Sequence, residues 1–201
     1  NSDKKVYLIS SMKEGVGKSY FSEKLIQKLS NFSEKICLID LDLRKKGISN
    51  TSSDFKVNGI STEDYLNNNL TFSDVALFKK PETDDPLKYL NSDKLENLIN
   101  SLKADFDKVF IDSPPMGTFI DAKIISNYAD QIICILSSHE SSFSEISSIN
   151  KEIKYKEKFI LKDNLYPGAY IIEIAQQIIN KEKDNKFNDF KKSYESLKRL
   201  S

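Results

Sequence analysis

The sequence predicts an α/β fold: a doubly wound, mainly parallel sheet flanked by helices, with a helical C-terminal tail. Short apolar runs alternate with stretches in which apolar residues recur at helical spacing, and this alternation is typical of βαβ units. The runs are apolar throughout, as in strands that helices cover on both faces. The chain has 201 residues and equal numbers of acidic and basic residues, which suits one such domain.

The expected elements follow in chain order. Strands are expected over Lys5–Ser10, Lys35–Asp40, Val75–Phe78, Lys108–Asp112, Gln131–Leu136 and Lys158–Leu161. Helices are expected over Lys18–Ser30, from Ser61 onward, and around Leu95–Leu102, with loops over 45–60 and between Pro81 and Pro86. Beyond residue 165 the pattern changes to two helices, Tyr170–Ile179 and Phe187–Leu200. We therefore expect a domain over 1–165 and a helical extension over 166–201, packed on it or extending from it.

Composition excludes several classes of protein. Cys37 and Cys134 lie in apolar runs and are expected to be reduced core thiols. Two cysteines and the single His139 cannot form a Cys/His zinc site, and they disfavour a Ser-His-Asp hydrolase. Zero net charge gives no direct signal for nucleic-acid binding. No apolar run approaches the ~18 residues of a membrane span, and no signal-peptide pattern is present, which predicts a cytoplasmic protein.

The strongest chemical signal is the decapeptide SSMKEGVGKS, Ser10 to Ser19. It follows an expected strand and opens an expected helix, which is the context of a phosphate-binding loop. Gly15 and Gly17 let backbone N–H groups curl toward an anion. Lys18 can reach the β and γ phosphates, and the hydroxyl of Ser19 can bind Mg²⁺. Met12 stands where such loops usually have glycine.

Aspartates follow two of the strands. Asp40 and Asp42 end the second apolar run, and Asp112 ends the run Lys108–Asp112. The carboxyl ends of parallel strands meet at one edge, so these carboxylates should converge on the phosphates. Three carboxylates together favour a bound cation. The alternative is that Asp40 and Asp42 serve as cap or turn residues.

Together, SSMKEGVGKS, ICLIDLDLR and VFIDSPP resemble the Walker A, A′ and B motifs of the bacterial protein tyrosine kinases. These BY-kinases are cytoplasmic P-loop NTPase domains linked to capsule and exopolysaccharide export, and they belong to the deviant-Walker class. The resemblance spans about residues 5–137, and Asp121 also stands where the family usually has aspartate.

The resemblance implies ATP and Mg²⁺ as cofactors and transfer of the γ-phosphate to tyrosine. It implies a catalytic set of Lys18, Asp40, Asp42 and Asp112. It implies nucleotide contacts from Lys13, Glu14, Gly15, Val16, Gly17, Lys18, Ser19, Tyr20 and Arg44, and metal contacts from Ser19, Asp40 and Asp112. Expected partners are ATP or ADP, further copies of the chain, and a membrane-anchored polysaccharide co-polymerase segment or activator. Such a segment would place the domain at the cytoplasmic face of the inner membrane.

Two alternatives stay open. Lys13 matches the extra loop lysine of partition-type ATPases, which predicts hydrolysis with nucleotide-controlled dimerisation. The family's cluster of adjacent tail tyrosines is represented by four isolated ones, Tyr155, Tyr166, Tyr170 and Tyr194. Of these, Tyr194 is the first candidate acceptor, or else a core-facing ring on the Phe187–Leu197 stripe. The second alternative is a non-catalytic nucleotide-binding regulator of polysaccharide chain length.

Overall fold

The structure is a computed structural model that describes residues 5–31, 34–44, 59–67, 72, 74–137 and 157–162. The expected domain boundary at 165, both tail helices, His139 and the four candidate acceptor tyrosines lie outside the described residues. The loop expected over 45–60 also lies outside the described residues, except for Gly59 and Ile60 at its end.

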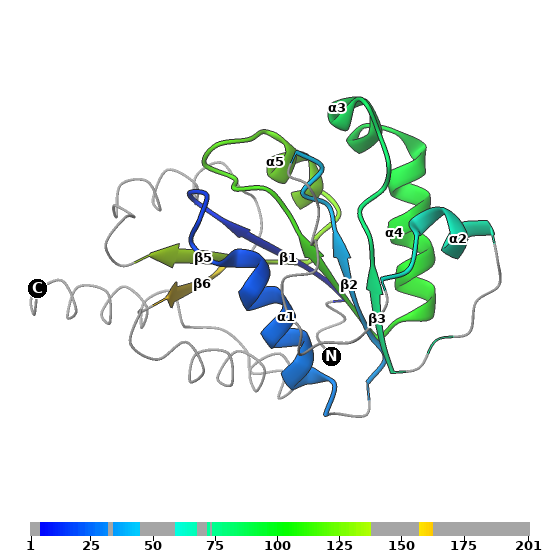
Figure 1. The fold of residues 1–201 in the computed structure, drawn as a ribbon, viewed down its shortest axis with the longest axis horizontal. Coiled ribbons are helices and arrows are strands. Elements are labelled where there is room, and N and C mark those ends of the chain that lie inside the picture. Colours follow the sequence, from blue (N-terminus) through cyan, green and yellow to red (C-terminus); the bar gives the residue numbers. More distant parts are fainter. Residues whose placement is uncertain are drawn as a thin grey trace, which may run out of the picture.

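A parallel sheet of six strands forms the centre of the described structure (Figure 1). The strand order is β3-β2-β4-β1-β5-β6, and every strand pairing is parallel. The strands are β1 (Val6–Ser11), β2 (Ile36–Asp40), β3 (Val75–Phe78), β4 (Lys108–Asp112), β5 (Gln131–Ser137) and β6 (Glu157–Lys162). The chain winds to one side of β1 and then to the other, which confirms the predicted doubly wound sheet.

Helices cover both faces of this sheet (Figure 1). They are α1 (Lys18–Leu29), α2 (Thr62–Asn67), α3 (Pro86–Leu90), α4 (Asp93–Asp105) and α5 (Asp121–Ser126). On one face, α1 buries apolar side chains such as Leu25 against Ile9 and Phe110. On the other, α4 and α5 bury side chains such as Leu98 against Leu8. Neighbouring strand residues therefore face opposite layers, which explains why the runs are apolar throughout.

Two short helices were not foreseen. The segment between Pro81 and Pro86 is a loop as expected, but Pro86 then begins the unforeseen helix α3. Asp85 caps that helix by accepting a hydrogen bond from the Lys88 N–H at 3.0 Å, and proline suits the first helical position. The other unforeseen helix is α5, which has only six residues and too few positions for a clear helical period.

The cysteines behave as predicted. Cys37 and Cys134 are both free and buried. Burial raises the pKa of the Cys37 thiol well above its ordinary value, so the thiol stays protonated and unreactive. Across the part of the chain that the structure describes, no helix has the length and apolar character needed to cross a bilayer.

Candidate functional site

The loop between β1 and α1 has the backbone that a phosphate loop needs. Gly15 and Gly17 adopt left-handed φ values of 79° and 78°, which residues with a Cβ rarely adopt. Gly17 is the N-cap of α1, and no side chain caps that end of the helix. The first turn of α1 also contains no acidic residue. The amide groups and the dipole at this helix start are therefore left to an external anion.

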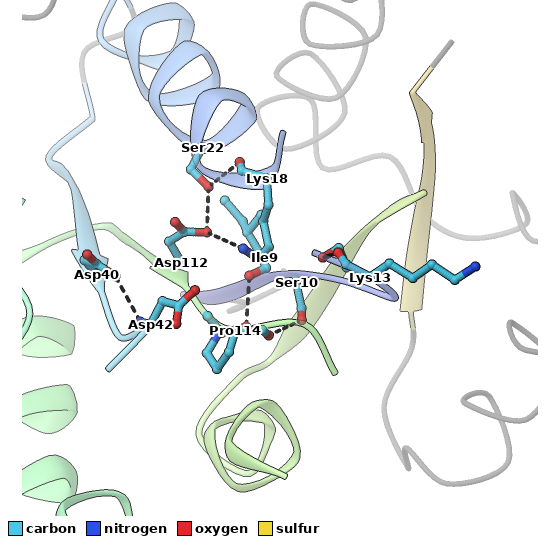
Figure 2. A network of polar contacts seen from close by, with 11 residues as sticks. Ile9, Ser10, Lys13, Lys18, Ser22, Asp40, Asp42, Asp112 and Pro114 are labelled. Atoms are coloured by element: carbon cyan, nitrogen blue, oxygen red, sulfur yellow. Dashed lines mark hydrogen bonds and ion pairs between the residues drawn. The ribbon is translucent and has the colours of Figure 1, made fainter. Parts of the chain in front are cut away.

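Lys18 and Asp112 form the buried centre of the site (Figure 2). The Lys18 ammonium lies 4.0 Å from Asp112 Oδ1, and both side chains are buried. The Ser22 hydroxyl lies 3.3 Å from the same oxygen. Burial raises the pKa of Asp112 to about 6, although the Lys18 charge and a hydrogen bond from Ser19 act to lower it. The charges of Asp40 and Asp42 raise it further.

Asp40 and Asp42 lie beside Asp112, as the sequence predicts. Asp40 is the register partner of Asp112 across β2 and β4. The Leu41 N–H donates to the Asp112 carbonyl at 2.8 Å, and the Asp42 N–H donates to Asp40 Oδ1 at 2.9 Å. One carboxylate oxygen of Asp40 therefore serves as a turn acceptor, which is the alternative role that the sequence left open. The convergence of the carboxylates exists as well.

Two carboxylate oxygens at this site are buried without a hydrogen-bond partner among the described residues: Asp42 Oδ1 and Asp112 Oδ2. A buried charged oxygen without a partner is costly, so such oxygens call for a cation. Within the described ranges, no group of three or more His, Cys, Asp or Glu side chains is arranged to hold a metal by itself. Mg²⁺ typically takes one or two carboxylates and completes its shell with phosphate oxygens and water. The residues therefore fit Mg²⁺ that binds together with a nucleotide.

The segment after β4 is held against the phosphate loop by hydrogen bonds and by a close backbone approach. The Ser10 hydroxyl donates to the Pro114 carbonyl at 2.9 Å, and the Met116 N–H donates to the Ser11 carbonyl at 2.8 Å. A Cβ on Gly117 would lie 2.4 Å from the Met12 carbonyl oxygen, so only glycine fits there. Sequence reasoning missed Gly117 and Ser22, because a close approach between distant segments leaves no local pattern.

Arg44 lies against α5. Its Nε and a terminal nitrogen donate to the two carboxylate oxygens of Asp121 at 2.7 and 2.9 Å. Its guanidinium carbon is 4.9 Å from the centre of the Phe119 ring. Asp121 is completely buried. Arg44 was expected to contact the nucleotide, and any such contact would come from a guanidinium that Asp121 already holds.

The other predicted nucleotide contacts differ in exposure. Lys13 and Glu14 are exposed, and Figure 2 shows the Lys13 side chain extending away from Lys18 and Asp112. Val16 is buried, whereas Tyr20 is 51% exposed, with the Lys24 ammonium 5.8 Å from its ring centre. The structure thus gathers Lys18, Asp40, Asp42 and Asp112 at one point, while the Lys13 side chain lies outside this group.

Comparison with known proteins places the chain in a family. The model of family AAA_31, described as an AAA domain, matches residues 4–166. The chain belongs to this family. Tyrosine-protein kinase CpsD of Streptococcus agalactiae serotype III (strain NEM316) is 32% identical over 145 residues, which are 66% of this chain and 61% of CpsD. The chain thus spans about three fifths of that relative. The resemblance to bacterial tyrosine kinases is confirmed.

Solved structures show the same fold. The kinase domain of Escherichia coli tyrosine kinase ETK superposes with a TM-score of 0.66 at 19% identity, covering 81% of this chain and 68% of that one. The septum site-determining protein MinD from Pyrococcus horikoshii OT3, complexed with Mg-ADP, gives 0.60 at 23% identity, covering 87% and 76%. At these identities the likeness shows the fold alone, which is the predicted P-loop fold. It does not distinguish a kinase from a hydrolytic ATPase.

Proposed function

We propose that this chain is an ATP- and Mg²⁺-dependent protein tyrosine kinase domain linked to polysaccharide biosynthesis or export. The observation that carries the proposal is the pair of unpartnered buried oxygens on Asp42 and Asp112, next to Lys18 and an uncapped helix start. Phosphoryl transfer depends mainly on positioning and charge neutralisation, and this arrangement supplies both. The similarity to CpsD favours tyrosine as the acceptor.

In this proposal each residue has a defined task. The backbone of residues 13–19 holds the phosphates, and Lys18 places its ammonium on them. Ser19 and Asp112, with Asp40 beside them, hold Mg²⁺, which neutralises the transferring phosphoryl group. Asp42 accepts the proton of the incoming tyrosine hydroxyl, since its Oδ1 has no partner within the described structure. The proposed partners are further copies of the chain and a membrane-anchored segment or activator.

A hydrolytic ATPase is the second candidate. It is favoured by the exposed Lys13, whose side chain extends away from the chain's own Lys18 and Asp112 (Figure 2). In that case water replaces tyrosine, and Lys13 of a second copy stabilises the developing charge. Lys13→Ala would then stop both hydrolysis and nucleotide-dependent dimerisation. For a kinase, the same variant should still form phosphotyrosine. A non-catalytic regulator would bind nucleotide but would neither form phosphotyrosine nor release phosphate.

The test is incubation of the purified chain with ATP and Mg²⁺, followed by mass spectrometry for phosphotyrosine and a phosphate-release assay. We expect phosphotyrosine in the wild type. Its loss is expected when Tyr155, Tyr166, Tyr170 and Tyr194 are all replaced by Phe. Phosphate release at equal rates by both proteins, with no phosphotyrosine in either, would overturn the kinase proposal.

Lys18→Met removes the cation but keeps an unbranched side chain of similar length, so it should abolish most ATP binding. The matched control is Lys28→Met, because Lys28 is exposed in the last turn of the same helix. Isothermal titration with ATP and Mg²⁺ measures both affinities, and circular dichroism checks that both variants fold. Equal affinity in folded Lys18→Met and wild-type protein would contradict the assignment of the loop.

A further inference from the structure

We propose that Asp121 is a positioning residue: it holds residues 41–44 through Arg44, and so keeps the Asp42 carboxylate at the nucleotide site. The inference rests on the proposed function, since it concerns how the same site is held together. It assigns a mechanical task to a residue that lies outside the Walker motifs.

Asp121 is well placed to act as a fixed anchor. It begins α5, and the next residues of that helix that face the sheet, Ala122 and Ile125, are completely buried in the core. Its two oxygens accept from two nitrogens of Arg44 at 2.7 and 2.9 Å. A bidentate guanidinium–carboxylate pair fixes orientation as well as distance. Stacking of the guanidinium over Phe119 restricts Arg44 from a second side.

Residues 41–44 carry Asp42 beyond the end of β2. The Leu41 N–H is held by the Asp112 carbonyl, and the Asp42 N–H by Asp40 Oδ1. Further along this segment, the Arg44 side chain is held by Asp121. Since Asp42 Oδ1 has no partner in the described structure, its position depends on the backbone on either side of it. The pair with Asp121 fixes the far side.

The Arg44 charge also acts on Asp42 directly. The pKa of Arg44 is raised mainly by its hydrogen bonds to Asp121, and the charge of Asp42 raises it as well. The positive charge of Arg44 therefore acts on two carboxylates, Asp121 on α5 and Asp42 at the site. Loss of the Asp121 charge would leave Arg44 free to turn toward Asp42 and occupy the oxygen that the reaction needs.

A purely structural ion pair would behave differently, and the chain contains one for comparison. Lys108 Nζ lies 2.9 Å from Glu34 Oε2, and Lys108 is at the start of β4, opposite its site end at Asp112. Glu34→Gln breaks this pair far from the site. It should change stability slightly and leave the geometry of Asp42 unchanged.

The test compares Asp121→Asn with Glu34→Gln by amide hydrogen exchange, which needs neither nucleotide nor turnover. In Asp121→Asn, the Asp42 amide should exchange about tenfold faster or more, because its segment opens locally. Amides in the middle of β2, such as Leu38, should keep their protection. Glu34→Gln should leave the Asp42 amide as in the wild type. Unchanged exchange at Asp42 in Asp121→Asn would overturn the proposal.

A second arm uses kinetics. Asp121→Asn should lower kcat while the KM for ATP changes little, because the phosphate loop is untouched. In an Asp42→Asn background it should cause no further loss, since both changes act on one carboxylate. Additive losses would contradict the proposal. If Asp121→Asn does not fold, Arg44→Lys and Arg44→Gln carry the same measurements, because Arg44 lies at the surface. If the wild type forms neither phosphotyrosine nor phosphate, the proposed function fails, while hydrogen exchange still decides the role of Asp121.

Discussion

Replacing Asp112 by Asn should make the nucleotide-free protein more stable at neutral pH. Burial raises the pKa of this carboxyl from its ordinary 3.8 to about 6 in the folded chain. At pH 7 Asp112 therefore carries a negative charge that is less favourable in the folded protein than in the unfolded chain. Asn has nearly the same shape and cannot ionise, so it resembles the protonated carboxyl.

The size of the effect follows from the two pKa values. Between about pH 4 and 6 the folded state binds more protons than the unfolded state, so wild-type stability falls as pH rises through this range. Above both pKa values, the folded state carries the full free-energy cost of the buried Asp112 charge. The difference between 3.8 and about 6 corresponds to about 3 kcal/mol of unfolding free energy. Asp112→Asn should recover up to this amount at pH 7 and almost none below pH 4.

Urea unfolding at a series of pH values measures this difference directly. Mg-ADP should stabilise the wild type more than Asp112→Asn, because the metal ligand is lost. The control is Asp130→Asn, since Asp130 Oδ2 accepts from the Lys5 and Val6 N–H groups at 2.8 Å each. That change should destabilise the protein by about 1–2 kcal/mol. If Asp112→Asn is no more stable than the wild type at pH 7, the burial argument for this carboxyl is wrong.

Two further predictions concern the stability of the chain. Gly117→Ala should destabilise the chain by about 1–3 kcal/mol and weaken ATP binding, because its Cβ would press on the Met12 backbone. Gly59→Ala, whose Cβ meets only the flexible Lys79 side chain, is the control, and equal melting temperatures would refute the argument. Tyr65→Phe should cost about 1 kcal/mol through the lost 2.9 Å hydrogen bond to Asp105. Chemical denaturation measures it, and an unchanged midpoint would contradict that role.

The sequence predicted the sheet and the loop well because both depend on local patterns. Six apolar runs became six parallel strands, and GVGKS follows β1 and runs into the first turn of α1 as expected. The partnership of Arg44 with Asp121 could not be predicted in this way, since 77 residues separate the two and no local pattern pairs them. The same holds for Ser22 and Asp112. Helix α3 was missed because Pro86 suggests a break, whereas proline also begins helices.

The uncapped start of α1 has a consequence for how much folded protein a cell contains. Helix α1 begins at Lys18, and its N-cap Gly17 offers no side-chain cap, so an anion bound in the loop would add to its stabilisation. A ligand that binds only the folded state shifts the folding equilibrium by mass action, by about 2.7 kcal/mol at a hundred times its dissociation constant. That shift changes the folded-to-unfolded ratio about a hundredfold. We therefore expect the lifetime of this protein against proteases to follow the nucleotide concentration around it.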